Sequence, residues 1–287
     1  MPCGAADSCY SQIRRLTMIT LALVQTRPRF LDVEANWKAV AGIIERTQAD
    51  LFVLPELFLS GYTFSSSEEV ASAALTHDGR VFDAMREVSA VRGIAICGGY
   101  AEAAGDNRQT MYNSAFFIAD GAIVANYRKT HLFYRESQFF APGDSGFATL
   151  EYRGTRFGIM ICFDWIFPES ARTLALMGAQ VILHPSNLVL PYCQKAMYAR
   201  AIENRVFIAT VNRVGRETNT LGDDLTFTGQ SQLVSPLGEY LLSLAETEEA
   251  VQTITVDPVI ADNKQLNAFN TILADRRPEM YRVSMQS

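Results

Sequence analysis

Residues 156–169 have the sequence RFGIMICFDWIFPE, a pattern that predicts a strand, a turn and the start of a helix. The apolar run 157–161 is short and contains β-branched residues, which predicts a strand that is covered on both faces. Pro168 suits the first position of a helix, where Glu169 would lie in the positively polarised first turn. Cys162 therefore stands at the carboxyl end of a strand, in a strand–turn–helix unit. In α/β folds, ligands and nucleophiles gather at this position.

The composition narrows the class of protein. The chain has 287 residues, of which 48% are hydrophobic and 20% charged, and this is enough to bury one large core. The net charge of -6 and the lack of a basic run argue against a nucleic-acid partner. No apolar stretch is long enough to cross a bilayer, and residues 1–17 lack a hydrophobic signal core. We therefore expect a cytoplasmic protein that does not bind membranes, with residues 1–17 as a poorly ordered N-terminal extension.

Cysteine and histidine are too sparse for a metal site or a disulfide framework. The five cysteines are scattered, and their number is odd. The three histidines lie far apart and show no ligand spacing, so we expect no metal and no other cofactor. A triad built on histidine is also short of candidates, which turns attention to carboxylates and lysines as the acid–base groups. The cysteines are Cys3, Cys9, Cys97, Cys162 and Cys193.

Units of strand, helix and strand alternate along the chain with hairpins. Asp32 is expected to cap a helix over residues 33–47, and Asp120-Gly121 is a strong two-residue hairpin turn. No linker-like stretch interrupts the order, so we predict a single α/β domain over residues 18–261, with helices outside and sheets inside. The polar and aromatic tail, residues 262–287, resembles an arm that packs at an oligomer interface. The predicted strands are 20–25, 50–54, 94–100, 113–119, 122–127, 157–161, 180–184, 206–212, 226–235, 240–244 and 251–256.

Three side chains of complementary chemistry stand directly after predicted strands: Glu56, Lys129 and Cys162. Each has an ordinary interpretation by itself, as a turn carboxylate, a solvated lysine and a buried small hydrophobe. A charged group at such a place is costly to desolvate unless it is paired or used. Together they supply a thiol nucleophile, a base that deprotonates it and a cation that stabilises an oxyanion. We favour this joint, catalytic interpretation.

Three blocks of the sequence resemble the signature blocks of the nitrilase superfamily, the carbon–nitrogen hydrolases. They are LPEL at residues 54–57, followed by Gly61-Tyr62, then YRKTHL at residues 127–132, and GIMICFDW at residues 158–165. With further matches, the resemblance covers roughly residues 19–257 in the order of the family. Several ordered blocks are far more specific than one short motif.

The resemblance implies a four-layer α-β-β-α sandwich and a set of roles. By position, Glu56 is the general base, Lys129 the oxyanion partner and Cys162 the nucleophile. Glu136 is the best match to a second glutamate that orients the lysine and the substrate nitrogen, although an exposed loop carboxylate is the alternative. The backbone N–H of Phe163 would complete the oxyanion site.

The substrate-binding residues are less well determined by the sequence. Tyr62, Phe163, Trp165 and Asn187 are candidates by position. The aromatic residues among them have an alternative role in core or subunit packing, because aromatic side chains dominate such contacts.

The substrate class follows from departures within the family. Nitrilases of the best-known branch carry Trp-Glu after the cysteine, whereas this chain has Phe163-Asp164. N-carbamoyl-amino-acid hydrolases tend to place basic residues there, and none stands before Glu169. We therefore predict an amidase that converts a small aliphatic amide to a carboxylate and ammonia through a cysteine thioester. An aliphatic nitrilase and an N-carbamoyl amidohydrolase are alternatives, and an inactive binding protein or a redox protein on the same fold is the alternative outside enzymes.

Members of the family usually pair through the helix after the cysteine and a later helix, which here holds residues 200–204. The resemblance thus implies a homodimer or a larger homo-oligomer. On the first of these helices, we place Arg172, Leu174 and Leu176 at the predicted interface.

Overall fold

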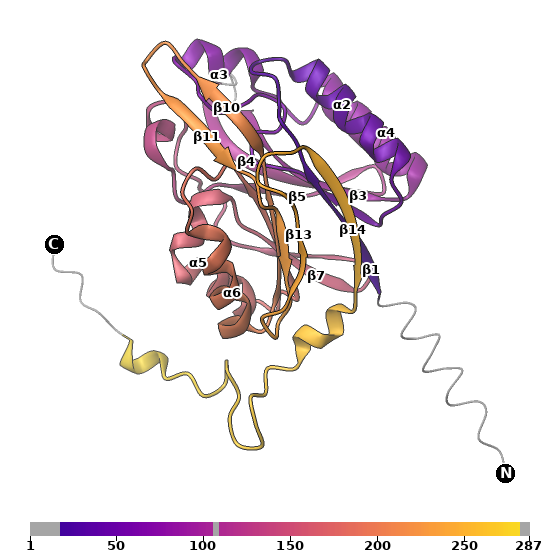
Figure 1. Cartoon of the computed structure of the whole chain (residues 1–287), viewed down its shortest axis with the longest axis vertical. Coiled ribbons are helices and arrows are strands. Elements are labelled where there is room, and N and C mark those ends of the chain that lie inside the picture. Colours follow the sequence, from indigo (N-terminus) through magenta and orange to yellow (C-terminus); the bar gives the residue numbers. More distant parts are fainter. Residues whose placement is uncertain (1–17, 106–108, 282–287) are drawn as a thin grey trace.

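The computed structural model describes residues 18–105 and 109–281, and it contains two six-stranded sheets that lie between helices (Figure 1). In the first sheet the strand order is β14-β1-β2-β3-β4-β5, with β1, β2 and β3 parallel and β14 antiparallel to β1. These strands are β1 (Ile19–Gln25), β2 (Leu51–Val53), β3 (Ala95–Ala104), β4 (Thr110–Ala119), β5 (Ala122–Arg128) and β14 (Ala250–Val256).

In the second sheet the strand order is β13-β12-β9-β8-β7-β6, with β7, β8 and β9 parallel. Two further strands, β10 (Val214–Thr218) and β11 (Asp224–Thr228), pair only with each other and project beyond the sheets (Figure 1). The strands of the second sheet are β6 (Thr149–Tyr152), β7 (Thr155–Ile159), β8 (Val181–Ser186), β9 (Phe207–Asn212), β12 (Gln232–Val234) and β13 (Tyr240–Ser243).

Helices cover the outer face of each sheet. The helices α2 (Val33–Arg46) and α4 (Arg80–Arg92) pack on the first sheet, and α5 (Pro168–Leu176) and α6 (Cys193–Asn204) pack on the second. This arrangement confirms the predicted four-layer sandwich within one domain. The remaining helices are α3 (Ser67–Ala73) and the 3-10 helices η1 (Tyr134–Gln138), η2 (Cys162–Ile166), η3 (Pro258–Asp262) and η4 (Pro278–Met280).

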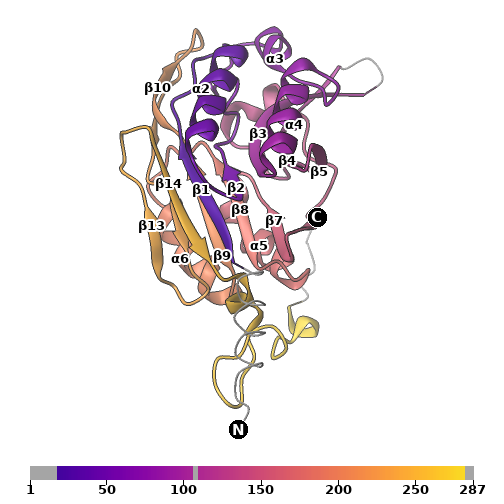
Figure 2. The ribbon, with the colours of Figure 1, turned by 90° about the vertical axis from the view of Figure 1, so that its right-hand side faces the viewer.

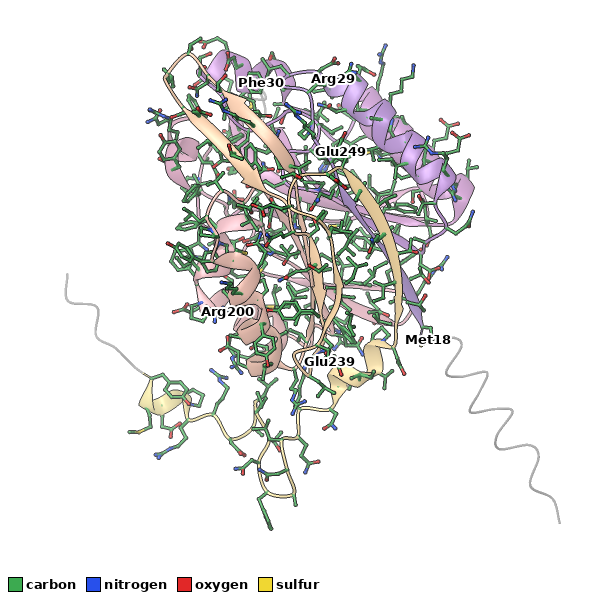
Figure 3. The ribbon with its side chains drawn as sticks, viewed as in Figure 1. Met18, Arg29, Phe30, Arg200, Glu239 and Glu249 are labelled. Atoms are coloured by element: carbon green, nitrogen blue, oxygen red, sulfur yellow. The ribbon has the colours of Figure 1, made fainter. Side chains whose placement is uncertain are left out.

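Apolar side chains fill the space between the two sheets, where the sticks of Figure 3 are dense. Phe117 of the first sheet meets Phe157 of the second, with 5.7 Å between ring centroids. Strands β1 and β14, from opposite ends of the chain, run side by side, and the segment after η3 extends beyond the sandwich (Figure 2). Among residues 18–105 and 109–281, no helix is long and apolar enough to span a bilayer.

Several local predictions are confirmed. The side chain of Asp32 accepts a hydrogen bond from the Ala35 backbone and caps α2. Asp120 and Gly121 both have positive φ, 50° and 77°, as a tight turn between β4 and β5 requires. The prediction for residues 1–17 lies outside the described residues.

Three predictions are wrong in detail. The strand that leads to Cys162 ends at Ile159 rather than at residue 161, because Cys162 has φ of 40° and the chain leaves the sheet before it. The stretch 226–235 is not one strand. It divides into β11 and β12, which lie in different sheets, because Gly229 and Gln230 have positive φ and turn the chain between them.

The third error concerns the outer face of α5. Leu174 is fully buried, and its side chain packs against Gly158 of the second sheet, so it cannot belong to an interface. Leu176 is about half exposed, as predicted for the outer face. Residues two apart on a helix point in different directions, which separates these two leucines.

Candidate active site

The three strand-end residues of the sequence analysis meet at one edge of the sandwich. Glu56 lies in the turn after β2, and Lys129 directly follows β5, so both come from the first sheet. Cys162 begins η2, which follows β7 of the second sheet. The charges of Glu56 and Lys129 both act on the thiol of Cys162, where Glu56 raises the pKa and Lys129 lowers it.

The backbone around Glu56 is held against β3. The N–H of Gly99 donates to the Pro55 carbonyl at 3.0 Å, and the N–H of Phe58 donates to the Gly99 carbonyl at 3.1 Å. A Cβ atom at residue 99 would lie 2.5 Å from the Cα of Glu56, so only glycine allows this approach. Leu57 has φ of 48°, and the chain therefore turns sharply just after the carboxylate.

Lys129 is fully buried between two carboxylates. Its Nζ donates to Glu56 Oε1 at 2.7 Å, and to the two oxygens of Glu136 at 2.7 and 2.9 Å. Burial by itself would lower the pKa of Lys129, but the charges of Glu136 and Glu56 raise it well above its usual value. The lysine therefore stays a cation inside the protein.

Two neutral side chains complete this cluster. Asn113 of β4 donates from Nδ2 to Glu56 Oε1 at 2.7 Å and to Glu136 Oε2 at 3.4 Å. The hydroxyl of Tyr62 donates to Glu136 Oε1 at 2.8 Å. Asn113 was not among the predicted site residues, because in the sequence it marks only the start of an apolar strand.

One carboxylate oxygen of the cluster has no hydrogen-bond partner among the described residues. Glu56 Oε1 accepts from both Lys129 and Asn113, whereas the buried Oε2 has no hydrogen-bond partner in the described part of the chain. Such an orphaned acceptor is rare in protein interiors. It leaves one oxygen of the carboxylate free to take a proton.

Glu136 lies in η1 and is 4% exposed, so the alternative of an exposed loop carboxylate is wrong. Burial raises its pKa, Lys129 opposes this effect, and the charge of Glu56 adds to it. The pKa nevertheless ends above its usual value. Two carboxylates share one cation here, and this makes the second negative charge costly.

Cys162 is presented by a strained backbone. Its φ of 40° is a left-handed conformation that costs about 1–3 kcal/mol for a residue other than glycine. The carboxylate of Asp164 supports the turn, because Oδ2 accepts from the Ile161 N–H at 2.9 Å and from the Tyr127 hydroxyl at 2.8 Å. Its Oδ1 contacts His131 Nδ1 at 2.7 Å.

His184 holds the carbonyl group of the cysteine. Its Nε2 lies 2.9 Å from the Cys162 oxygen, and its Nδ1 lies 3.0 Å from Thr210 Oγ1. A carbonyl can only accept, so Nε2 carries the proton. Burial lowers the pKa of His184 to about 4, which keeps the imidazole neutral at pH 7. The histidine thus supports the turn and does not contact the thiol through these bonds.

The thiol itself is not ionised at rest. Burial raises the pKa of Cys162 well above its usual value, Glu56 raises it further, and Lys129 opposes both. At neutral pH the sulfur therefore carries its proton, and a nearby acceptor is needed to remove it.

Three of the four predicted substrate-binding residues line one narrow pocket with Cys162. They are Phe163, Trp165 and Asn187, and the apolar residues Phe133, Leu188, Val189 and Leu190 complete the lining. The Asn187 side chain is buried, and neither amide atom has a partner among the described residues. The fourth, Tyr62, lines a neighbouring pocket with Glu136.

The profile of the Carbon-nitrogen hydrolase family matches residues 20–264. The chain belongs to this family. Carbon–nitrogen hydrolases act on carbon–nitrogen bonds other than peptide bonds, and the chain is a hydrolase of this class. Among the described residues of this hydrolase, no group of three or more His, Cys, Asp and Glu side chains is arranged to hold a metal ion.

Similar proteins include a nitrilase and amidases. The chain is 43% identical to "Nitrilase" of Pyrococcus abyssi, over 92% of this chain and 99% of that protein. It is 37% identical to "(R)-stereoselective amidase" of a Pseudomonas species, over 79% of this chain and 81% of that protein. The solved structure of an amidase from Nesterenkonia sp. is 27% identical with a TM-score of 0.75, and the match covers 91% of this carbon–nitrogen hydrolase and 94% of that amidase.

Proposed function

We propose that the protein is an amidase that converts a small aliphatic amide to a carboxylate and ammonia through a thioester on Cys162. The observation that supports this most is the difference between the two carboxylate oxygens of Glu56. Lys129 and Asn113 hold Oε1, while the buried Oε2 has no partner in the described chain. A protonated thiol on which the charge of Glu56 acts, and a fixed carboxylate with one free oxygen, suit a nucleophile and its general base.

In the acylation step, Glu56 Oε2 takes the thiol proton as the sulfur of Cys162 bonds to the amide carbon. The carbonyl oxygen becomes an oxyanion, which Lys129 Nζ and the backbone N–H of Phe163 stabilise. Glu56 then gives its proton to the amide nitrogen, the carbon–nitrogen bond breaks and ammonia leaves. A thioester remains on Cys162.

In the deacylation step, Glu56 takes a proton from water, whose oxygen attacks the thioester carbon. The same oxyanion site is used again. When the carbon–sulfur bond breaks, the sulfur leaves and regains the proton from Glu56. The carboxylic acid that forms gives its proton to ammonia or water, so carboxylate, ammonium and free enzyme result, and no cofactor takes part in these steps.

We assign Glu136 to the orientation of the lysine. It binds Nζ through both oxygens and is itself held by the hydroxyl of Tyr62. With Nζ fixed, the ammonium group points to one place when the oxyanion forms, and it need not reorganise. Glu136 also offers an acceptor for the nitrogen of the substrate.

The pocket supports a small and uncharged acyl group. Phe163, Trp165 and the neighbouring apolar residues line it, and no charged side chain does. Asn187 is the polar member, and its unpartnered amide would bind a polar atom of the substrate, because a buried amide without a partner is costly. Tyr62 lines a separate pocket together with Glu136.

An aliphatic nitrilase is the second candidate. The 43% identity to the protein named nitrilase from Pyrococcus abyssi, over nearly the whole of both chains, favours it. Both reactions begin with attack of a thiol on a carbon bonded to nitrogen, so the same residues would serve.

Ammonia release from a panel of small aliphatic amides and the matching nitriles tests the proposal. We expect faster release from amides, and none from the Cys162→Ala variant. A folded wild-type protein that releases no ammonia from any amide would overturn the amidase proposal. Faster turnover of nitriles than of amides would reverse the ranking of the two candidates.

We also propose that two copies pair through α5 and α6, with the segment after residue 262 as an arm at this interface. Large apolar side chains are exposed on this face, including Leu176, Met177 and Tyr198. Tyr198 stacks on Tyr240 with 5.8 Å between ring centroids, which makes a rigid aromatic surface. Sedimentation should give a dimer or a larger assembly, and a monomer at micromolar concentration would contradict the proposal.

A further inference from the structure

The β10–β11 hairpin carries a carboxylate that holds the backbone next to the active site. Glu217 Oε2 accepts from the backbone N–H of Tyr62 at 2.9 Å and from that of Thr63 at 3.2 Å. Its other oxygen accepts from Arg213 Nη1 at 2.6 Å. Glu217 is 9% exposed and Arg213 is 1% exposed, so this ion pair is buried.

The same hairpin also contacts the ring of Tyr62. Phe227 of β11 packs edge-on against this ring, with 6.0 Å between centroids. The guanidinium of Arg213 lies over the ring of Phe227, 4.0 Å from its centroid. Both the backbone and the aromatic ring of Tyr62 are therefore fixed by residues 213–227.

A second carboxylate, near the end of the hairpin, holds the other loop of the site. Asp223 Oδ1 accepts from the Tyr134 hydroxyl at 2.7 Å and from Arg135 Nε at 3.1 Å. These two residues immediately precede Glu136 in η1. Asn219 donates to Asp223 Oδ2 at 2.7 Å and fixes the carboxylate on the hairpin.

We propose that the β10–β11 hairpin is a positioning element of the active site, which acts through Glu217 and Asp223. The two loops that it holds meet in the hydrogen bond between Tyr62 and Glu136, and Glu136 in turn binds Lys129. Strands β10 and β11 pair with no other strand of the described chain, and an isolated hairpin is only marginally stable in water. Its contacts to the two loops thus order the hairpin and the loops together.

The hairpin itself offers a matched control. Arg216 and Asp224 form an ion pair across it, and their side chains are 63% and 49% exposed. Asp224, the residue next to Asp223, is thus also a carboxylate, but its ion pair lies within the hairpin and holds neither loop. Asp224→Asn is the control for both Asp223 and Glu217.

The first measurement does not depend on turnover. Hydrogen exchange followed by mass spectrometry should show faster exchange over residues 61–64 and 133–139 in Asp223→Ala and Glu217→Gln, at a melting temperature that confirms folding. Asp224→Asn should match the wild type. Unchanged exchange in both loops of both variants would overturn the proposal, whether or not the protein proves to be an amidase.

The second measurement uses whichever amide or nitrile the wild type turns over fastest. We expect Asp223→Ala and Glu217→Gln to lower kcat about tenfold, the effect of one lost hydrogen bond near the reacting groups, with KM changed less than about twofold. Asp223→Asn keeps an acceptor for Tyr134 and should lose less. Higher KM at unchanged kcat would contradict a positioning role.

A double-mutant cycle tests the route through Tyr62. Tyr62→Phe removes the hydrogen bond to Glu136, so Glu217→Gln should lower kcat less in that background than in the wild type. Additive losses would mean that Glu217 does not act through Tyr62 and would overturn this part of the proposal. If no substrate is turned over, the amidase proposal fails, and the exchange experiment alone decides on the hairpin.

Discussion

Arg128 and Lys129 are neighbours in the sequence, yet they belong to two ionic clusters of different kinds. Arg128 binds Glu102 at 2.7 Å and Asp144 at 2.9 Å, and its side chain is 24% exposed. Lys129 is fully buried and binds Glu56 and Glu136. Successive side chains at the end of a strand point to opposite faces, which allows one strand end to serve two clusters.

The two clusters differ in how completely their carboxylates are hydrogen-bonded. Glu102 Oε1 accepts from Arg128, and Oε2 accepts from Ser114 at 2.6 Å, from Asn126 at 2.9 Å and also from Arg128. Burial opposes the ionisation of Glu102, but these hydrogen bonds outweigh it and lower its pKa. A carboxylate with this many donors stabilises the fold and has little capacity left to take a proton.

In the Lys129 cluster, by contrast, the hydrogen bonding of the carboxylates is incomplete, and one carboxyl pKa is raised rather than lowered. The pKa of Glu136 is raised, and Glu56 keeps one buried oxygen without a partner among the described residues. A buried ion pair thus points to chemistry when its hydrogen bonding is incomplete. Carboxylate variants of the Lys129 cluster should therefore affect turnover, whereas carboxylate variants of the Arg128 cluster should affect stability.

The largest expected contrast is in kcat. Glu56→Gln removes the free oxygen as a base, and we expect kcat to fall by about ten-thousand-fold, as for other members of catalytic groups that act as a unit. Glu102→Gln should leave kcat within about threefold of the wild type. Steady-state ammonia release checks both variants, and an active Glu56→Gln variant would contradict the assignment of the base.

The next contrast is in stability when the cation is removed. Lys129→Met leaves two buried carboxylates without their partner, which should cost roughly 3–5 kcal/mol in the free energy of unfolding. Arg128→Met, at a more exposed site, should cost about 1 kcal/mol. Urea unfolding at pH 7 measures both values.

The pH dependence of the stability of Lys129→Met tests whether the unpaired carboxylates cause its loss of stability. Lys129 now lowers the pKa of Glu136, so its removal raises that folded-state pKa further above the unfolded value. A raised carboxyl pKa favours the folded state at low pH, and this contribution is lost as the pH rises through the folded pKa. The deficit relative to the wild type should therefore shrink from pH 7 to pH 5, and a constant deficit would point to lost packing instead.

A smaller contrast is in the pH dependence of stability that two histidines contribute, His184 next to the active site and His77 next to the Arg128 cluster. The pKa of His184, behind Cys162, is lowered to about 4 by burial, so the unfolded chain binds a proton more readily between about pH 6.5 and pH 4. Stability should fall by about 2 kcal/mol from pH 7 to pH 5 on account of this residue. His77, which bonds to Tyr100 beside the Glu102 cluster, is only half-buried and should contribute less.

Unfolding of His184→Gln and His77→Gln at both pH values measures these contributions. The His184 variant should lose most of that pH dependence, and the His77 variant should keep it. Equal slopes in the two variants would show that burial of His184 does not control the effect.

The smallest contrast is in the stability of the two glutamine variants. Glu102→Gln leaves Arg128 and other donors facing an amide, and it should be less stable than Glu56→Gln by about 1 kcal/mol. In Glu56→Gln, Lys129 still has both oxygens of Glu136. Thermal unfolding of the variants side by side gives the difference, and equal stabilities would weaken the distinction between the clusters.

The sequence was enough to select the proposed catalytic residues, because each stands where an apolar run ends. Glu56, Lys129 and Cys162 could be selected in this way, and the family blocks then added Glu136. Asn113 could not be found, because its role depends on which side chains of neighbouring strands and loops face it. That arrangement is set by pairing across the sheet rather than by any local pattern.

The hairpin was missed for a related physical reason. In β10, buried and exposed positions are mixed and polar residues dominate, so hydrophobic periodicity gives no strand signal. Its order comes from Glu217 and Asp223, whose partners lie elsewhere in the chain, in the loops that hold Tyr62 and Tyr134. Leu174 was misplaced because a short apolar helix does not reveal from its sequence which of its leucines faces the sheet.

The position of β14 has a consequence for the newly made chain. Strand β14 pairs along its whole length with β1, and Val256 belongs to the apolar core between the sheets, as do Leu233 and Leu242. Cys162 lies in one half of this sandwich, and Glu56 and Lys129 lie in the other. During synthesis, the packing that fixes the halves against each other is complete only when residue 256 has left the ribosome. The thiol thus meets its proposed base and cation in their final geometry only after residue 256 has been made. Fragments that end before this residue contain all three side chains but not the packing that brings them together.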